Sequence, residues 1–224
     1  MRVLKGWFGE KKTTFFMWLS LDKDIYHRFH NVIIPSDNGT TQIDHLLISK
    51  YGIFIIETKN IKGWIFRSEK QERWTQVLFD YKYTFQNPLK QTYRQKKVLA
   101  EFFKIKESLI NTVIYFVGNS EFKTEMPYNV IDYRLTSYIK QFNNHIFSET
   151  EIERFIKVMK MHQLESKLSK KDHLRSLEQR LGSRSICPKC GSNLVIRQVK
   201  NGFNEGSKFW GCKGYPRCKF TKNI

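Results

Sequence analysis

The chain of 224 residues has no cysteine before position 187, no internal repeat and no long apolar run. Without cysteines over most of its length, the chain has no disulfide framework to stabilise it there. The longest apolar stretch near the start, residues 15–21, is much shorter than the roughly 20 residues of a membrane-spanning helix. No charged and apolar leader precedes that stretch, so we expect a soluble, cytoplasmic protein with no membrane partner.

Acidic residues are scarce, with 21 Asp and Glu against 39 Lys and Arg, and the net charge is +18. The excess is greatest per length in residues 184–224, which carry nine basic residues and one acidic residue. A polyanion is therefore the expected partner, most simply a nucleic acid. The alternative is a solvated basic surface that serves no particular partner.

Hydrophobic residues form 40% of the chain and aromatic residues 15%, which suffices for a core and argues against wholesale disorder. Apolar and β-branched runs predict strands at residues 28–34, 41–49, 52–59, 63–67, 74–79 and 112–118. Helices are expected over residues 9–21, from Pro88 after an Asn87 cap, and from Ser148 through a capping box. This order of elements predicts an α/β domain with a mixed sheet.

The length fits one domain of about 150 residues together with a small module. Residues 1–147 are expected to form the α/β domain, with its core at residues 9–120. Residues 148–183 are then a helical linker, and residues 184–224 form a separate module that contains all the cysteines.

The segment QIDHLLISKYGIFIIETKN, residues 42–60, interrupts two apolar strands with charged residues. If the loop between these strands has two or four residues, Asp44 lies directly opposite Glu57. A three-residue loop would make that pair diagonal instead. Because side chains alternate along a strand, Lys59 shares the face of Glu57.

Cross-strand carboxylates have Cβ atoms about 4.5–5.5 Å apart, and both do not stay ionised without compensation. Either one of them binds a proton, or a cation lies between them; a hard divalent ion such as Mg²⁺ takes oxygen ligands. Lys59 is then placed to hold a phosphate oxygen or to orient a water, as phosphodiester hydrolysis requires. The alternative is a surface hairpin with a solvated salt bridge, which the surrounding isoleucines and leucines disfavour.

An acid on one strand followed by Glu-x-Lys on the next resembles the PD-(D/E)xK nuclease superfamily, although Ile43 stands where that name places a proline. Three blocks resemble the nuclease-related domain (NERD) family in its order: GE at 9–10, QIDHLLISKYGIFIIETKNIKGWI at 42–65 and QNPLKQ at 86–91. The resemblance covers residues 9–120. It implies a restriction-endonuclease-like mixed sheet flanked by helices.

The resemblance also implies roles for single residues. Asp44 and Glu57 match ligands of Mg²⁺ or Mn²⁺, and Lys59 matches the catalytic lysine. Glu10 matches an acid that helps to bind the metal or its water, and Gln91 matches a position that lines the site. These five residues are the predicted catalytic set.

The four cysteines lie in two pairs, CPKC and CKGYPRC, at Cys187, Cys190, Cys212 and Cys218. Pairs at this spacing predict a tetrahedral Cys₄ zinc site with a structural role. The alternative is two disulfides in a secreted module, and no export signal supports it.

The pattern CPKCG…KFWGCKGYPRC resembles the C-terminal zinc ribbon of topoisomerases over residues 185–222, which implies contact with DNA, single-stranded or without sequence preference. Aromatic faces interleaved with cations suit base stacking beside phosphates. The alternative is that the aromatics only cover the zinc site, and we expect this of Phe209 or Trp210. The predicted nucleic-acid-binding residues are Lys200, Phe203, Lys208, Lys213, Tyr215, Arg217 and Lys219.

The sequence therefore predicts a Mg²⁺-dependent endodeoxyribonuclease domain tethered to a DNA-binding zinc ribbon. A second hypothesis is a nucleic-acid-binding adaptor that keeps the nuclease fold without turnover. The presence of the whole predicted catalytic set favours the enzyme. RNA in place of DNA is a third, weaker option.

Overall fold

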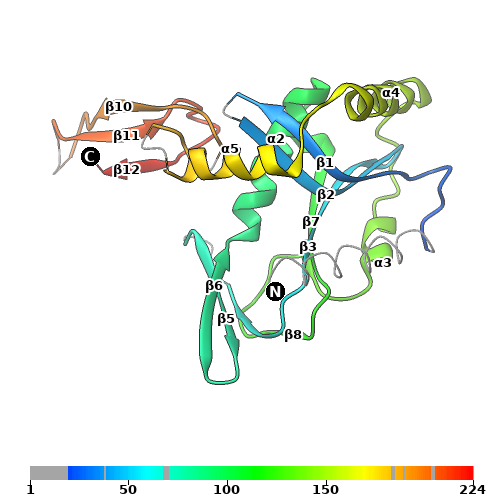
Figure 1. Cartoon of the computed structure of the whole chain (residues 1–224), viewed down its shortest axis with the longest axis horizontal. Coiled ribbons are helices and arrows are strands. Elements are labelled where there is room, and N and C mark those ends of the chain that lie inside the picture. Colours follow the sequence, from blue (N-terminus) through cyan, green and yellow to red (C-terminus); the bar gives the residue numbers. More distant parts are fainter. Residues whose placement is uncertain are drawn as a thin grey trace. The chain divides into compact units, whose positions relative to one another are not determined.

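The computed structural model describes residues 20–37, 39–67, 71–182, 185–188, 190–202 and 205–223 (Figure 1). Most of the helix expected over residues 9–21 lies outside the described residues. The chain forms two compact units, one drawn from Met1–Val32 and Gln42–Ser166, the other from Ile33–Thr41 and Lys167–Ile224. Within the described residues, no helix has the length and apolar character needed to span a bilayer.

A five-stranded mixed sheet is the main sheet of the structure (Figure 1). Its strand order is β1-β2-β3-β7-β9, and β3 pairs antiparallel with β2 and parallel with β7. With helices beside this sheet and a cysteine-rich module at the end of the chain, the predicted α/β class is confirmed. The strands are β1 (His27–Ser36), β2 (Gly39–Ser49), β3 (Gly52–Lys59), β7 (Ile110–Phe116) and β9 (Val130–Ile131).

The register of the β2–β3 hairpin is the predicted one. Ser49 pairs with Gly52, and the ladder continues to His45 opposite Ile56. Gly52 has φ +127°, a value that residues with a Cβ rarely adopt, so the glycine allows the tight turn. Strand β3 has partners on both sides and is buried along nearly its whole length.

Two helices pack on opposite faces of this sheet. Helix α2 (Pro88–Phe103) contacts β3 and β7, and the predicted cap is present, since Asn87 accepts a hydrogen bond from the Leu89 N–H. Helix α3 (Leu135–Lys140) packs on the other face through an apolar cluster that includes Phe54 and Ile56. A short 3₁₀ helix, Glu107–Leu109, precedes β7.

Helix α4 (Glu149–Glu165) begins at the predicted capping box, in which Ser148 and Glu151 bond each other's backbone N–H groups. Its Phe155 ring lies 5.0 Å from the ring of Phe103 in α2. Helix α4 therefore packs against the α/β core, inside the segment expected to be a linker.

A second, four-stranded sheet has the order β6-β5-β4-β8. It packs through Ile65 and Trp74 against Ile114 and Phe116 of β7. The sequence did not predict β6, because nearly all of its residues are exposed. The strands are β4 (Gly63–Phe66), β5 (Arg73–Leu78), β6 (Tyr81–Gln86) and β8 (Ser120–Phe122).

The second unit contains helix α5 (Lys170–Gly182) and a three-stranded antiparallel sheet of β10 (Leu194–Gln198), β11 (Lys208–Cys212) and β12 (Thr221–Asn223). Helix α5 packs against the turn between β1 and β2. Ser176 Oγ accepts a 2.8 Å hydrogen bond from the Thr40 N–H, and a Cβ on Gly39 would lie 1.9 Å from that same Oγ.

Candidate functional site

The charged end of β3 carries the first part of the site. Glu57 is 3% exposed, and Lys59, two residues further on the same face, donates to its Oε1 at 2.6 Å. The Lys59 ammonium also donates to Gln91 Oε1 of α2 at 3.0 Å. Strand β3 and helix α2 thus hold three of the predicted residues in direct contact.

Asp44 approaches the same place from β2. It lies one step beyond the last ladder pair, His45 and Ile56, in the register that sets it opposite Glu57. Asp44 is half-buried, and its Oδ2 accepts a hydrogen bond from the Thr58 N–H at 3.0 Å. The carboxylate therefore reaches across to the residue between Glu57 and Lys59.

Gln95 is a site residue that the sequence analysis missed. Its side chain is 1% exposed, and its Nε2 donates to Glu57 Oε2 at 2.8 Å and to the Gln42 carbonyl at 3.0 Å. Its spacing from Gln91 could have indicated a place in the site, because residues four apart on a helix share a face and Gln91 lies four residues earlier. One amide group thereby ties together the two strands that carry the carboxylates.

The structure thus brings together four of the five predicted catalytic residues, namely Asp44, Glu57, Lys59 and Gln91. The fifth, Glu10, lies outside the described residues. The possible metal ligands here are the carboxylate oxygens of Asp44 and Glu57 and the amide oxygen of Gln91. Mg²⁺ and Mn²⁺ prefer such oxygen ligands. These residues therefore fit a hard divalent cation and do not fit a soft metal.

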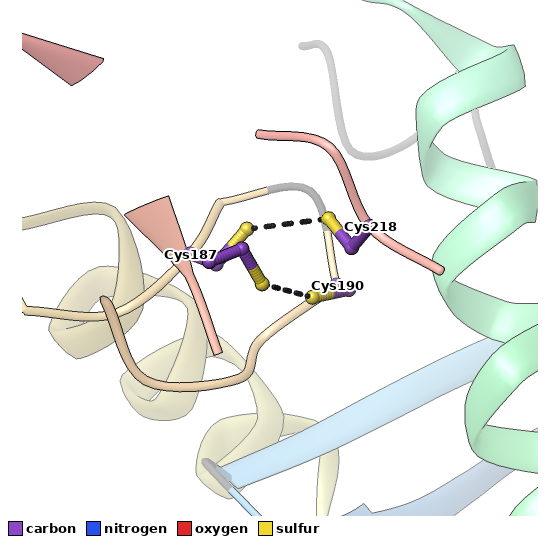
Figure 2. Close-up of side chains that lie close together, drawn as sticks. Cys187, Cys190 and Cys218 are labelled. Atoms are coloured by element: carbon purple, nitrogen blue, oxygen red, sulfur yellow. Dashed lines mark hydrogen bonds between the residues drawn. The ribbon is translucent and has the colours of Figure 1, made fainter. Parts of the chain in front are cut away.

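The four cysteines form the second candidate site: Cys187 and Cys190 precede β10, Cys212 ends β11, and Cys218 lies between β11 and β12. Their Sγ atoms all lie within 4.8 Å of one another, and Figure 2 shows the labelled side chains pointing toward a common centre. Cys187 Sγ lies 3.8 Å from Cys218 Sγ, and Cys190 Sγ lies 3.3 Å from Cys212 Sγ. With Zn–S distances of about 2.3 Å, sulfurs at tetrahedral corners are about 3.8 Å apart, so the set fits zinc.

The pKa values of three of the four thiols are shifted by burial and by the neighbouring cysteines. Hydrogen bonds with Cys187 and Cys218 hold the pKa of Cys190 well below its usual range, while those with Cys190 and Cys218 raise the pKa of Cys187. Burial raises the pKa of Cys212 to about 11. Four thiolates this close together need the charge of a bound cation between them.

Part of the predicted nucleic-acid-binding set lines one groove of the C-terminal module. Lys200, Tyr215 and Lys219 line it together with Arg197 and three aromatic or apolar side chains, Val199, Phe209 and Phe220. Lys208, Lys213 and Arg217 are exposed outside this groove, and Phe203 lies outside the described residues.

Arg197 is the groove residue that the sequence analysis missed. Its guanidinium lies 5.5 Å from the centre of the Tyr215 ring, which is 59% exposed. Its side chain crosses Gly211, where a Cβ would lie 2.6 Å from Arg197 Cδ. Trp210, by contrast, packs against the cysteine cluster, as expected of a structural aromatic.

The fold and these two sites define a nuclease-related α/β domain followed by a Cys₄ module of the topoisomerase type. Comparison with known families agrees. The family described as "Nuclease-related domain" matches residues 5–117, and "Topoisomerase DNA binding C4 zinc finger" matches residues 184–224. The chain belongs to the nuclease-related domain family.

Several curated proteins are similar to parts of the chain, among them the following three. An uncharacterized protein of Bacillus anthracis is 47% identical over 96 residues, 42% of this chain and 45% of that protein. DNA topoisomerase 1 of Methanocaldococcus jannaschii is 47% identical over 39 residues, 17% of this chain and 4% of the topoisomerase. DNA topoisomerase 1 of Archaeoglobus fulgidus is 51% identical over 35 residues, 16% of this chain and 5% of that enzyme.

The chain thus spans less than half the length of each of these relatives. No solved structure matches it.

Proposed function

We propose that this protein is a divalent-metal-dependent nuclease that hydrolyses phosphodiester bonds in DNA, with Mg²⁺ or Mn²⁺ at the first site and zinc at the second. The observation that carries the proposal is the contact of Lys59 with both Glu57 and Gln91, with Asp44 bonded to the adjoining backbone. The family to which the chain belongs supports the same chemistry. Cytoplasmic location stays a prediction.

Asp44 and Glu57 would hold the divalent ion, which as a Lewis acid polarises the phosphate and activates water. Lys59 is 17% exposed, so its ammonium is accessible to a phosphate oxygen or a water. Gln91 accepts one hydrogen bond from that ammonium and so keeps it directed into the site. The Lys59 charge then stabilises the negative charge that develops on the phosphate during hydrolysis.

The C-terminal module contributes affinity in this proposal. Its groove combines two lysines and an arginine with an exposed tyrosine, which suits phosphates beside stacked bases. Such contacts do not read base identity, so we expect little sequence preference.

Cleavage of circular DNA tests the proposal. Wild type and two variants, Glu57→Gln and the exposed control Glu153→Gln, are incubated with circular double- or single-stranded DNA and Mg²⁺. We expect Glu57→Gln to lose about 100-fold or more in rate, and Glu153→Gln to cleave as wild type does. Equal rates in all three would identify a contaminant and overturn the proposal.

Two further arms separate the alternatives. A chain that binds DNA in a salt-dependent manner but does not cleave it with any divalent ion is an adaptor, and the nuclease proposal fails. A circular RNA substrate included beside DNA decides which nucleic acid is cleaved faster.

A further inference from the structure

The β5–β6 hairpin exposes large aromatic side chains. Phe79 in the turn is 86% exposed, Tyr81 67% and Tyr83 40%. Figure 1 shows this hairpin extending away from β3 and β7 of its own unit. Four consecutive residues of β6 from Tyr81 onward are exposed, so side chains on both of its faces meet solvent. Soluble proteins rarely keep clustered aromatics exposed unless the surface has a partner.

The turn itself has an unfavourable conformation for its residue. Phe79 adopts φ +53°, in the left-handed region that glycine and asparagine occupy more easily. A bulky aromatic there costs stability, and at 86% exposure it gains little burial in return. A ring presented at the tip of a hairpin is consistent with a contact outside the chain.

The aromatic side chains are arranged as a surface for flat groups. The rings of Tyr81 and Tyr83 lie 6.4 Å apart and tilted by 36°, on the same face of β6. On the opposite face, Trp64 is 49% exposed, and the Lys123 ammonium lies 4.6 Å from the centre of its ring. Lys82 shares this second face, because Lys82 and Trp64 both pair with Val77.

The charge of the four-stranded sheet favours an anionic partner. Its described strands and the single residues that directly flank them carry five basic residues and three acidic ones; Glu72 pairs with Lys90, and Glu121 pairs with Lys123, which is one of the five. The basic residues are Lys62, Arg67, Arg73, Lys82 and Lys123, and the acidic ones are Glu72, Asp80 and Glu121. Exposed rings among cations suit unpaired nucleotides, which offer bases for stacking and phosphates for charge pairing.

The segment from β4 to β6, which contains the hairpin, is joined to the candidate site at both ends. Strand β4 begins four residues after Lys59, and β6 ends five residues before Gln91. Asn87 fixes the base of the hairpin to α2, since its Nδ2 donates to the Gln71 carbonyl and its N–H to the Glu72 carbonyl. Strands of six residues reach about 20 Å, which is the length of several nucleotides of a single strand.

We propose that the β5–β6 hairpin is a substrate arm, whose Phe79, Tyr81 and Tyr83 rings stack on unpaired bases a few nucleotides from the phosphate held at the Asp44–Glu57 site. The inference rests on the proposed function and narrows its substrate to nucleic acid with an unpaired stretch. Gapped, forked or single-stranded molecules offer such bases, whereas a blunt duplex keeps its bases stacked.

Binding measured apart from cleavage tests the arm. The full chain with Glu57→Gln, which we expect to cleave at least about 100-fold more slowly than wild type, is titrated into fluorescent single-stranded oligothymidine and into a blunt duplex. Adding Tyr81→Ser and Tyr83→Ser should weaken single-strand binding by roughly 30-fold or more, because each of the two stacked bases contributes about 1–3 kcal/mol. Duplex binding should change little. The control Tyr133→Ser removes an equally exposed tyrosine from outside the sheet and should change neither.

Two more variants keep the test decisive if the double serine variant is unstable. Tyr81→Phe with Tyr83→Phe keeps both rings and should keep single-strand binding. Phe79→Asn suits the left-handed conformation better, so it should fold at least as well and still bind single strands more weakly.

Single-strand affinity equal to that of the parent in both Phe79→Asn and the serine variant would overturn the proposal. Loss of a self-associated form in sedimentation, with unchanged affinity for the oligonucleotide, would also overturn it and identify β6 as a protein interface. The two proposals can fail separately, because this test measures binding. A chain that never cleaves DNA would refute the proposed nuclease activity, while these affinities would still decide whether the hairpin binds unpaired bases.

Discussion

The Gln95 side-chain amide donates a 2.8 Å hydrogen bond to Glu57 Oε2, on the opposite carboxylate oxygen from the one that Lys59 contacts. The same Nε2 bonds the Gln42 carbonyl, two residues before Asp44 in β2. Gln95 therefore sets the orientation of one carboxylate and the position of the strand that carries the other. Gln95 is therefore a positioning residue, which would act on a bound metal through Glu57.

Replacing Gln95 should weaken metal-dependent cleavage without abolishing the fold. Removing a hydrogen-bond partner of a metal ligand commonly costs roughly 10- to 100-fold in affinity or activity, and we expect Gln95→Ala to fall in this range. Gln95→Glu places a carboxyl group beside Glu57, which favours a shared proton and should move the pH–rate profile to higher pH. Single-turnover rates from pH 5.5 to 9 measure both effects. An unmoved profile in Gln95→Glu would contradict the positioning role.

The zinc site should be essential to the C-terminal module. We expect one zinc per chain by elemental analysis, and loss of that zinc in Cys190→Ser, because three thiolates and a hydroxyl no longer form the tetrahedral set. Chelation should release the metal and unfold the β10–β12 sheet, whose core is the cysteine cluster. Zinc-free protein with two disulfides by mass spectrometry would contradict the assignment.

Arg197 in the C-terminal groove should contribute both charge and geometry to DNA binding. Arg197→Ala should reduce the slope of log K for DNA binding against log salt concentration by about 0.7–0.9, the value expected for one lost phosphate contact. Gly211→Ala keeps the charge but displaces the arginine, since the new Cβ would lie 2.6 Å from Arg197 Cδ. It should weaken binding while the salt slope stays nearly the same. Lys222→Ala, an exposed change on β12 outside the groove, is the control; an equal effect there would contradict the groove as the binding surface.

His45 should make the fold sensitive to acid. Its Nδ1 lies 2.8 Å from His30 Nδ1, and burial together with His30 lowers the pKa of His45 to about 3. An unfolded histidine has a pKa of about 6.5, so below that pH the unfolded chain binds a proton that the folded chain does not. The resulting stability is present above pH 6.5 and is lost as pH falls toward 3, by at most about 1.4 kcal/mol per pH unit.

His45→Leu should therefore flatten the pH dependence of the free energy of unfolding between pH 6.5 and 4. Urea titrations of wild type and variant measure this difference. A slope as steep as that of wild type would mean that other groups, the carboxylates above all, cause the acid sensitivity.

The sequence predicted the strands and helix caps that depend on residues close together in the chain. Strand β3 was expected at residues 52–59 and occupies Gly52–Lys59, because its buried apolar run and the following charges are both visible in the sequence. The caps at Asn87 and Ser148 likewise depend on side chains within three residues.

The parts that the sequence did not predict depend on distant contacts. Strand β6 has almost no buried residue, so no apolar pattern marked it, and α3 has only six residues. Gln95 was not predicted, and its hydrogen bond to the Gln42 carbonyl joins residues 53 positions apart in the chain. The Arg197 side chain lies across Gly211 of the neighbouring strand, a contact that depends on strand pairing.

A titration of Mn²⁺ into the zinc-loaded full chain, followed by calorimetry, tests most directly whether Asp44 and Glu57 together hold a divalent ion. For the wild type we predict a Mn²⁺ site in addition to zinc, weakened at least about 10-fold in Asp44→Asn and in Glu57→Gln and unchanged in Glu153→Gln. Equal heats in all four proteins would contradict the account.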